Sequence, residues 1–529
     1  MRARGRRLPL LAVPALLASA LCLLPVVYLI LRAAGDRQAW DVLARSRTLD
    51  LVVDTAALAL AVTACAIAIG VPLAWLVTRT DLPGRRIWAL LAALPLVIPS
   101  YVAALALLGA FGPRGMLQRA LEAPFGVERL PEIYGFVGAL LALTLSTYPY
   151  VFLLVAAALR SHDPALEEAS RSLGRSPVAT FVRTTVPALR PSIAAGGLLV
   201  ALYSLSDFGA VSLMQYDSLT RAIYLRYRTL IDREPAAVLA LVLVALTALI
   251  LLLEARSRGR ARYFRASPGA ARVARPVQLG HWRWPAVAFC GLVVGAFLAL
   301  PLGVLGYWFV RSISLGHEVG VPWGPALNSL EVSFLAALAA VVAVLPVVLL
   351  ARRHPAGWTR ALERVCYTPN ALPGIVLALS LVFFTAHYAG PLYQTLSVLV
   401  FAYVIRFFPQ ALAGTSSALD VVSPRLEEAA RSLGRGPGAA FALTTARLAQ
   451  PGLAAGAALV FLSAMKELPA TLLLRPIGFE TLATEVWKFT SLGFYSQAAP
   501  PALALILVSA PFVYLLTSRG SSDAGTLSG

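Results

Sequence analysis

The string "LEEASRSLGRSP", Leu166–Pro177, returns 260 residues later as "LEEAARSLGRGP", Leu426–Pro437. From Asp163 to Gly196, 19 of 34 positions are identical to those 260 residues downstream. A loop that only connects two helices needs to be polar, but it does not need the same order of Glu, Arg, Gly and Pro twice. The repetition therefore predicts two related halves, each with a polar segment that performs the same task.

The residues around these strings are strongly apolar. Hydrophobic residues make up 59% of the 529 and charged residues only 13%, whereas soluble domains are about a quarter charged. A helix that crosses a bilayer needs about 20 mainly apolar residues. We therefore predict an all-α integral membrane protein with about twelve transmembrane helices. The expected spans are 9–31, 51–77, 88–111, 134–159, 193–215, 236–254, 285–310, 327–351, 366–387, 391–415, 452–475 and 499–517.

The first expected span has two interpretations. The N-terminal arginines and the Ala18-Ser19-Ala20 sequence are typical of a cleaved signal peptide. However, the apolar run continues through Leu31, which is long for a signal core and favours an uncleaved span.

The distribution of charge indicates how the chain lies in the membrane. The net charge of +19 could indicate a nucleic-acid partner, but the basic residues gather in alternate loops, as expected for cytoplasmic loops. This pattern predicts that the N-terminus, both repeated strings, the mid-chain linker and the C-terminus lie in the cytoplasm. Loop 32–50 opposes the rule, although its aspartates offset its arginines. The expected environment is the bacterial inner membrane, and no nucleic acid is expected to bind.

The halves are separated by a polar, arginine-rich stretch. We predict a first half at 1–254 with its polar loop at 161–190, and a cytoplasmic linker at 255–284. The second half then spans 285–529 with its loop at 421–450. Each repeated string follows the fourth span of its half, so the halves are expected to be parallel repeats related by an axis along the membrane normal.

The repeated string has the signals of a helix, a turn and a second helix. Asp163-Pro164 and Ser423-Pro424 place an N-cap residue before a proline at the first helical position. A glycine follows that can adopt positive φ and end the helix, and then a proline that can begin the next one.

This segment resembles the cytoplasmic EAA loop of ABC importer permeases. Glu168-Ala169-Ser170 is followed by Gly174, and Glu428-Ala429-Ala430 by Gly434. The resemblance implies a type I ABC importer permease fold, in which the first helix of the loop enters a groove on the ATPase subunit. The residues expected to couple to the ATPase are Glu167, Glu168, Ala169, Arg171, Gly174, Pro177, Glu427, Glu428, Ala429, Arg431, Gly434 and Pro437.

The chain itself lacks the signature of an ATPase. Its two lysines, Lys466 and Lys488, do not follow glycine, so a GxxxxGK[ST] phosphate loop cannot form. We therefore expect no enzymatic activity and no cofactor bound by this chain. ATP and Mg are expected on two copies of a separate ATPase subunit, and a periplasmic or surface solute-binding protein is expected to deliver the solute.

Four polar residues fall inside expected spans at matched places in the halves. Asp207 aligns with Glu467, and Ser206 with Lys466. Polar groups within spans usually face the bundle interior, so these four could line a translocation path. Alternatively, Asp207 caps a broken helix, and Lys466 and Glu467 form structural pairs with neighbouring helices. No metal site is assigned, because the five histidines lack metal-ligand spacing.

The string "KELPATLLLRPIGFETLATEVW", Lys466–Trp487, resembles the second half of fused ferric-iron ABC permeases, as do "SDFGA" and "PLVIPSYVAA". This resemblance implies alternating-access import of Fe(III). Related permeases carry thiamine, polyamines or oxyanions, which remain alternative solutes. A secondary transporter that needs no ATP, or a membrane scaffold that moves nothing, is an alternative of another class.

Overall fold

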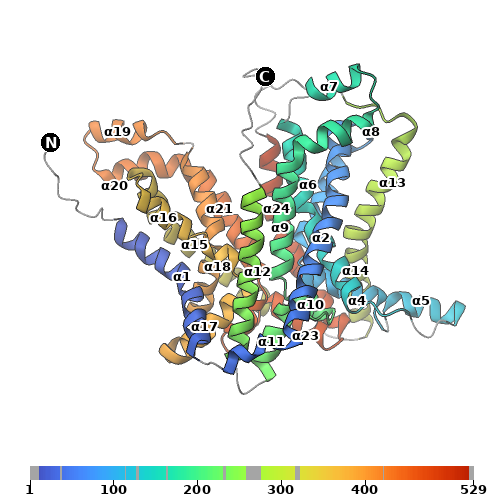
Figure 1. The fold of residues 1–529 in the computed structure, drawn as a ribbon, viewed down its shortest axis with the longest axis horizontal. Coiled ribbons are helices and arrows are strands. Elements are labelled where there is room, and N and C mark those ends of the chain that lie inside the picture. The colour runs from blue at the N-terminus through green and yellow to red at the C-terminus, as the bar shows by residue number, and fades with distance from the viewer. Residues whose placement is uncertain are drawn as a thin grey trace.

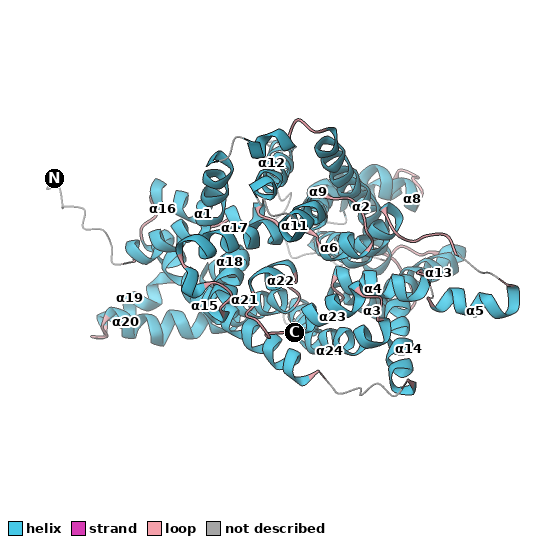
Figure 2. Ribbon diagram, turned by 90° about the horizontal axis from the view of Figure 1, so that it is seen from below, coloured by secondary structure: helices cyan, strands magenta, loops and turns pink. Residues whose placement is uncertain are grey.

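The computed structural model describes residues 11–35, 38–113, 115–126, 130–161, 165–229, 234–257, 276–315, 322–420 and 422–522. Within these ranges the chain is almost entirely helical, and one isolated bridge between Thr80 and Val277 is the only β-type pairing (Figure 2). The all-α prediction is confirmed.

The helices of the first half follow in the predicted order. They are α1 (Ala12–Gly35), α2 (Ser46–Arg79), α3 (Arg85–Ala93), η2 (Leu94–Val97), α4 (Ser100–Phe111), α5 (Met116–Phe125), α6 (Phe136–Ser161), α7 (Ala165–Ser172), α8 (Pro177–Thr180), η3 (Phe181–Thr185), α9 (Val186–Ser206), α10 (Gly209–Leu213), α11 (Leu219–Thr229) and α12 (Glu234–Ser257).

The second half repeats this order. Its helices are α13 (Arg283–Val294), α14 (Leu300–Ser314), α15 (Trp323–Arg353), α16 (Gly357–Val365), η6 (Thr368–Ala371), α17 (Gly374–Tyr388), α18 (Leu396–Asp420), α19 (Pro424–Ser432), α20 (Pro437–Ala440), η8 (Phe441–Ala446), α21 (Arg447–Met465), α22 (Pro469–Leu474), α23 (Leu482–Ser491) and α24 (Tyr495–Ser522). The segments η3 and η8 are single π-helical turns at matched places.

Ten described helices are long and apolar enough to cross a membrane, and one bent pair, α16 with α17, raises the count to eleven. The expected span 499–517 lies within a further helix, α24, which is outside that count. The prediction of about twelve spans is therefore confirmed.

Two expected spans, 88–111 and 366–387, are broken rather than continuous. Each is divided by a proline, Pro99 before α4 and Pro373 before α17, and α16 and α17 meet at 103°. A residue that precedes proline is driven out of the helical region. Ile98 and Leu372 accordingly have extended backbones, with ψ of 112° and 113°.

The expected spans 193–215 and 452–475 are also interrupted. α9 ends at Ser206 and α21 at Met465, and a short helix follows each break. The hydropathy of these stretches hid the breaks, because the residues after them are apolar as well.

The first helix of each half packs against the other half. α1 contacts α15, α16 and α17, and α14 contacts α4. The Tyr28 hydroxyl donates to the Phe383 carbonyl at 3.2 Å, and the Trp308 ring nitrogen donates to the Gly109 carbonyl at 3.1 Å. The division of the chain at 1–254, 255–284 and 285–529 stays a prediction from the repeat, because contacts join the halves into one bundle.

The linker is described only at its ends. Residues 258–275 lie outside the described part, while α12 continues to Ser257. Beyond the gap, the Val277 amide donates to the Arg79 carbonyl at 2.8 Å. This backbone hydrogen bond holds the end of the linker beside the end of α2.

α7 and α19 lie at one end of the molecule, and α11, α17 and α23 lie at the other (Figure 1). Viewed from that second end, α11, α22 and α23 are near the middle of the bundle (Figure 2). Both repeated loops therefore share one face, as expected for parallel repeats.

Candidate functional site

Each repeated string folds as a short helix followed by a glycine turn. Gly174 has a φ of 81° and Gly434 a φ of 83°, a left-handed backbone that glycine adopts without strain. The Arg175 amide reaches back to the Ser170 carbonyl at 3.4 Å, and the second loop makes the same bond at 3.2 Å. This is the hydrogen-bond pattern of a Schellman motif, which ends a helix sharply.

The prolines begin helices as predicted. Pro177 starts α8 and Pro437 starts α20. α19 begins directly after Ser423, but the Ser423 side chain makes no capping hydrogen bond. Residues 162–164, which include the expected cap of α7, lie outside the described part.

The same ion pair joins each loop to the second span of its half. Arg79 is the last residue of α2, and its Nε lies 3.7 Å from Glu167 Oε1. Arg353 is the last residue of α15, and its Nη2 lies 2.8 Å from Glu427 Oε1. The first pair is buried, with both side chains 6% exposed. The two ion pairs therefore join α7 to the end of α2 and α19 to the end of α15.

Aromatic contacts strengthen this junction. The Arg353 guanidinium lies 5.7 Å from the centre of the Phe441 ring, a cation–π distance. In the first half, the Phe181 ring lies 4.9 Å from the Trp75 ring. Phe181 and Phe441 begin the π-helical turns η3 and η8, and such turns are frequent at functional sites.

The loops present both charge and apolar surface. Glu168 and Glu428 are exposed, in contrast to the buried Glu167. Leu173 and Leu433, at the ends of α7 and α19, are 80% and 83% exposed. The same exposed leucine thus recurs at the same place in both loops. Of the other predicted coupling residues, Ala169, Gly174, Ala429, Arg431, Gly434 and Pro437 are exposed, and Arg171 and Glu427 are half-buried.

The second candidate site lies at the broken helices. Asp207 occupies the break after α9, where Oδ1 accepts hydrogen bonds from the amides of Ala210 at 2.9 Å and Val211 at 3.3 Å. The Ser100 hydroxyl donates to Oδ2. Asp207 therefore caps α10 and ties it to the start of α4, which agrees with the structural alternative for this residue.

The matching break in the second half uses a different partner. Glu467 Oε1 accepts from the Ala470 amide at 3.3 Å, and Oε2 accepts from Arg406 Nε at 3.0 Å. Gly374 takes the place of Ser100, and a Cβ there would lie 2.7 Å from Glu467 Oε1. The missing side chain makes room for the guanidinium of Arg406, a residue that was not singled out from the sequence.

The two breaks meet between the halves. Lys466 Nζ donates to the Leu96 carbonyl of η2 at 3.1 Å. The Ser206 hydroxyl instead donates to the Tyr203 carbonyl within its own helix at 3.0 Å. Thus Lys466 crosses from one half to the other, whereas Ser206 does not. Whether these four residues line a translocation path stays a prediction.

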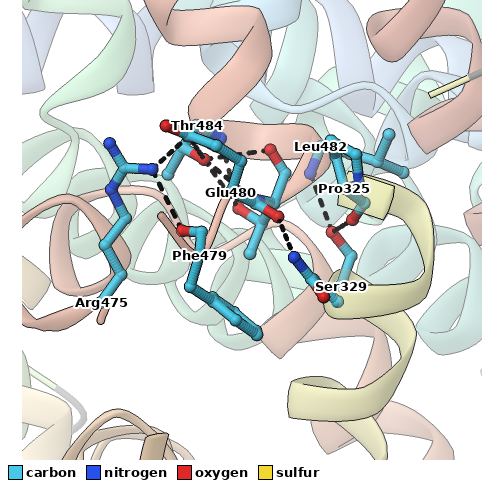
Figure 3. Close-up of polar contacts among 9 residues, drawn as sticks. Pro325, Ser329, Arg475, Phe479, Glu480, Leu482 and Thr484 are labelled. Atoms are coloured by element: carbon cyan, nitrogen blue, oxygen red, sulfur yellow. Dashed lines mark hydrogen bonds and ion pairs between the residues drawn. The ribbon is translucent and has the colours of Figure 1, made fainter. Parts of the chain in front are cut away.

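A third matched contact holds the start of α11 and α23. The Leu219 amide donates to the Thr55 hydroxyl at 3.0 Å, and the Leu482 amide donates to the Ser329 hydroxyl at 2.8 Å. Figure 3 shows the second of these contacts beside Arg475 and Glu480, which form an ion pair. Among the described residues, we find no cluster of three or more His, Cys, Asp or Glu side chains suited to a metal ion.

Two matched loops thus lie on one face of a single helix bundle, and each is joined by an ion pair to a long apolar helix. The family described as "Binding-protein-dependent transport system inner membrane component" matches residues 66–263 and 348–518. The chain belongs to this family of multi-span inner-membrane proteins and has its type I permease fold. The family model thus matches the chain twice, once on either side of the middle of the predicted linker.

Curated proteins similar to this chain carry related names. The Fe(3+)-transport system permease protein FbpB 2 of Haemophilus influenzae is 36% identical over 502 residues, which cover 94% of this chain and 95% of that protein. The ferric transport system permease protein FbpB of Actinobacillus pleuropneumoniae is 26% identical over 69% of this chain and 56% of its own length. A probable molybdenum ABC transporter permease protein of Haloferax volcanii is 33% identical over 36% of this chain and 69% of its own length.

Proposed function

We propose that this chain supplies both halves of the permease of an ATP-driven ferric-iron importer. The observation that carries the proposal is the duplicated junction, Arg79 with Glu167 and Arg353 with Glu427. One chain offers two equivalent docking loops, so it suits two copies of an ATPase subunit. ATP and Mg are then bound by those subunits, and the permease performs no hydrolysis.

The mechanism follows from where the loops are fastened. When the ATPase pair closes, α7 and α19 move together and pull on the ends of α2 and α15 through the ion pairs. Packing of α1 and α14 across the halves carries this motion through the bundle. Since packed interfaces switch between discrete arrangements, the bundle alternates between inward and outward access. The loops, the N-terminus and the C-terminus face the cytoplasm in this arrangement.

Fe(III) is the proposed solute because the relative that matches nearly the whole chain is named as an Fe(3+) permease. An oxyanion is the second candidate, supported by the shorter match to a molybdenum permease. A binding protein with clustered Tyr and carboxylate ligands would deliver Fe(III), since this hard cation prefers oxygen ligands.

Reconstitution tests the import function. Proteoliposomes would contain the full chain with its ATPase and would receive the loaded binding protein outside. ATP-dependent accumulation of radioactive Fe(III) is expected, and molybdate, sulfate, thiamine and a polyamine serve as competing solutes. Uptake that continues without the ATPase would identify a secondary transporter, and no uptake of any solute would identify a scaffold.

A variant of both loops tests the docking assignment. Glu168→Lys together with Glu428→Lys reverses the charge of two exposed residues. We expect loss of ATPase copurification and of uptake, with normal membrane insertion. Unchanged uptake in this double variant would contradict the proposal.

A further inference from the structure

A pocket of about 390 Å³ lies where α11, α22 and α23 meet. Figure 1 places α11 and α23 at the end of the molecule opposite α7 and α19, which is the outward end in the proposed orientation. Its walls come from both halves, with Tyr224 and Arg228 on α11 and Trp487 and Lys488 on α23. Small-molecule sites have volumes of about 300–1,000 Å³. The pocket is therefore sized for a small chelate rather than for a bare ion.

The charge of the lining is positive. Arg228, Arg475 and Lys488 line the pocket, and no Asp or Glu does. Glu480, which lies outside the lining, pairs with Arg475. Among the described residues, Arg228 and Lys488 form no ion pair within 4 Å, although the carboxylates of Glu480 and Glu485 are near enough to interact with the charge of Lys488. A cleft lined by one sign of charge concentrates ligands of the opposite sign.

Further lining groups suit a ligand with oxygen atoms. The Tyr224 hydroxyl accepts a hydrogen bond from Arg228 Nη1 at 3.0 Å, which leaves its own hydrogen for a ligand oxygen. Gln394 also lines the pocket, and its backbone has a φ of 55°. This conformation is uncommon for a residue other than glycine, and it occurs preferentially at ligand sites.

The pocket adjoins the broken helices. The Trp487 ring lies 5.0 Å from the ring of Phe208, which directly follows Asp207. On the other side, Leu473 belongs to α22, the short helix that follows Glu467. A ligand in the pocket thus lies beside the two breaks at which the halves meet.

We propose that this pocket receives Fe(III) as an anionic carboxylate complex and not as a bare cation. The inference rests on the proposed ferric-iron import and specifies the form in which the cargo enters. Because Arg475 is paired with Glu480, Arg228 and Lys488 are the cations that repel free Fe(III) and attract a complex whose carboxylates outweigh the metal charge. Arginine also matches carboxylate geometry with two parallel hydrogen bonds. Fe(III) in turn favours such oxygen ligands.

Binding to the full chain in lipid nanodiscs tests this proposal without ATP turnover. The probes are ferric citrate, which is anionic, and a cationic ferric trihydroxamate. Binding is followed by quenching of tryptophan fluorescence, and Trp487→Phe identifies the part of the signal that arises in the pocket. We expect saturable binding of ferric citrate, weaker at high salt, and no binding of the cationic complex.

The double variant Arg228→Gln with Lys488→Gln is expected to weaken ferric citrate binding about tenfold or more. Arg311→Gln is the matched control, because Arg311 is an exposed arginine of α14 outside the pocket. Equal binding of the two probes, or unchanged binding in the double variant, would overturn the proposal. Either result would leave ATP-dependent Fe(III) uptake intact, whereas failure of the import function would appear as absent uptake in the wild-type proteoliposomes.

Discussion

Arg79 and Glu167 face each other at 3.7 Å where α2 meets α7, and Arg353 and Glu427 repeat the contact at 2.8 Å where α15 meets α19. The pairs are equivalent in position but not in environment. Arg79 and Glu167 are both 6% exposed, whereas Arg353 is 39% exposed. The ion pair of the first loop is therefore buried, whereas that of the second loop is partly exposed to solvent.

Replacing Glu167 by Gln is expected to destabilise the protein more than replacing Glu427 by Gln. Removal of one member of a buried pair costs about 3–5 kcal/mol, while an exposed pair contributes about 1 kcal/mol or less. The thermal unfolding midpoint of the purified chain measures the difference. Glu168→Gln should leave the midpoint unchanged, and equal shifts for the first two variants would contradict the unequal burial.

Both variants should also lower the amount of solute moved per ATP hydrolysed. The ion pairs link the loops to α2 and α15. Without them, we expect the ATPase to stay bound to the loops, while its closure moves these two helices less. The ratio of uptake to hydrolysis in proteoliposomes measures this effect. If the ATPase dissociated instead, the pairs would serve docking and not transmission.

Leu173→Asp together with Leu433→Asp should prevent the ATPase from docking. These leucines are 80% and 83% exposed, and burial of a leucine in a partner contributes about 1.5–3 kcal/mol. Copurification of the ATPase measures the loss. Ile477→Asp is the control, because Ile477 is 90% exposed but lies after α22. Full copurification with the double variant would rule out a hydrophobic docking surface at the loop ends.

Arg406→Gln should destabilise the second half, because it removes the charge that faces Glu467 in the protein interior. The expected loss is about 3–5 kcal/mol. Gly374→Ala tests the same contact by crowding, since its Cβ would lie 2.7 Å from Glu467 Oε1. Gly303→Ala is the control, because a Cβ at Gly303 of α14 would meet nothing within 4 Å. The unfolding midpoint should be lower for Gly374→Ala than for Gly303→Ala, and the reverse order would contradict the packing.

A low pH should destabilise the loop around Glu480, which connects α22 with α23. Burial by itself raises the pKa of Glu480, but hydrogen bonds from Arg475 and Thr484 and the Arg475 charge outweigh it, so the pKa is lowered. Because the pKa of Glu480 is lower in the folded protein, ionised Glu480 stabilises the fold fully above the pKa of an unfolded Glu, about 4.3. This stabilisation is lost as the pH falls through the lower pKa of the folded protein. Unfolding midpoints between pH 6 and 3 measure this loss, which should be smaller in Glu480→Gln. Parallel pH curves for the two proteins would contradict it.

The broken helices show where prediction from sequence stops. Hydropathy cannot distinguish one span of 193–215 from α9, a break at Asp207 and α10, because apolar residues lie on both sides. Pro99 and Pro373 mark two of the breaks, but α2 and α15 contain a proline without being broken. Proline alone therefore did not predict which spans are broken. Arg406 lies inside the expected span 391–415, and a charge there is itself a signal, but its partner Glu467 is 61 residues away and could not be predicted.

The sequence by itself determined the membrane class, the helical fold, the two halves and the helix-turn-helix form of both loops. Each of these depends on local composition, on periodicity or on repetition within the chain. Only the tertiary structure decided that Glu167 and Glu427 turn toward Arg79 and Arg353. It also brought three cationic side chains around one pocket between the halves. Such contacts depend on the packing of helices distant in sequence, and no local pattern encodes them.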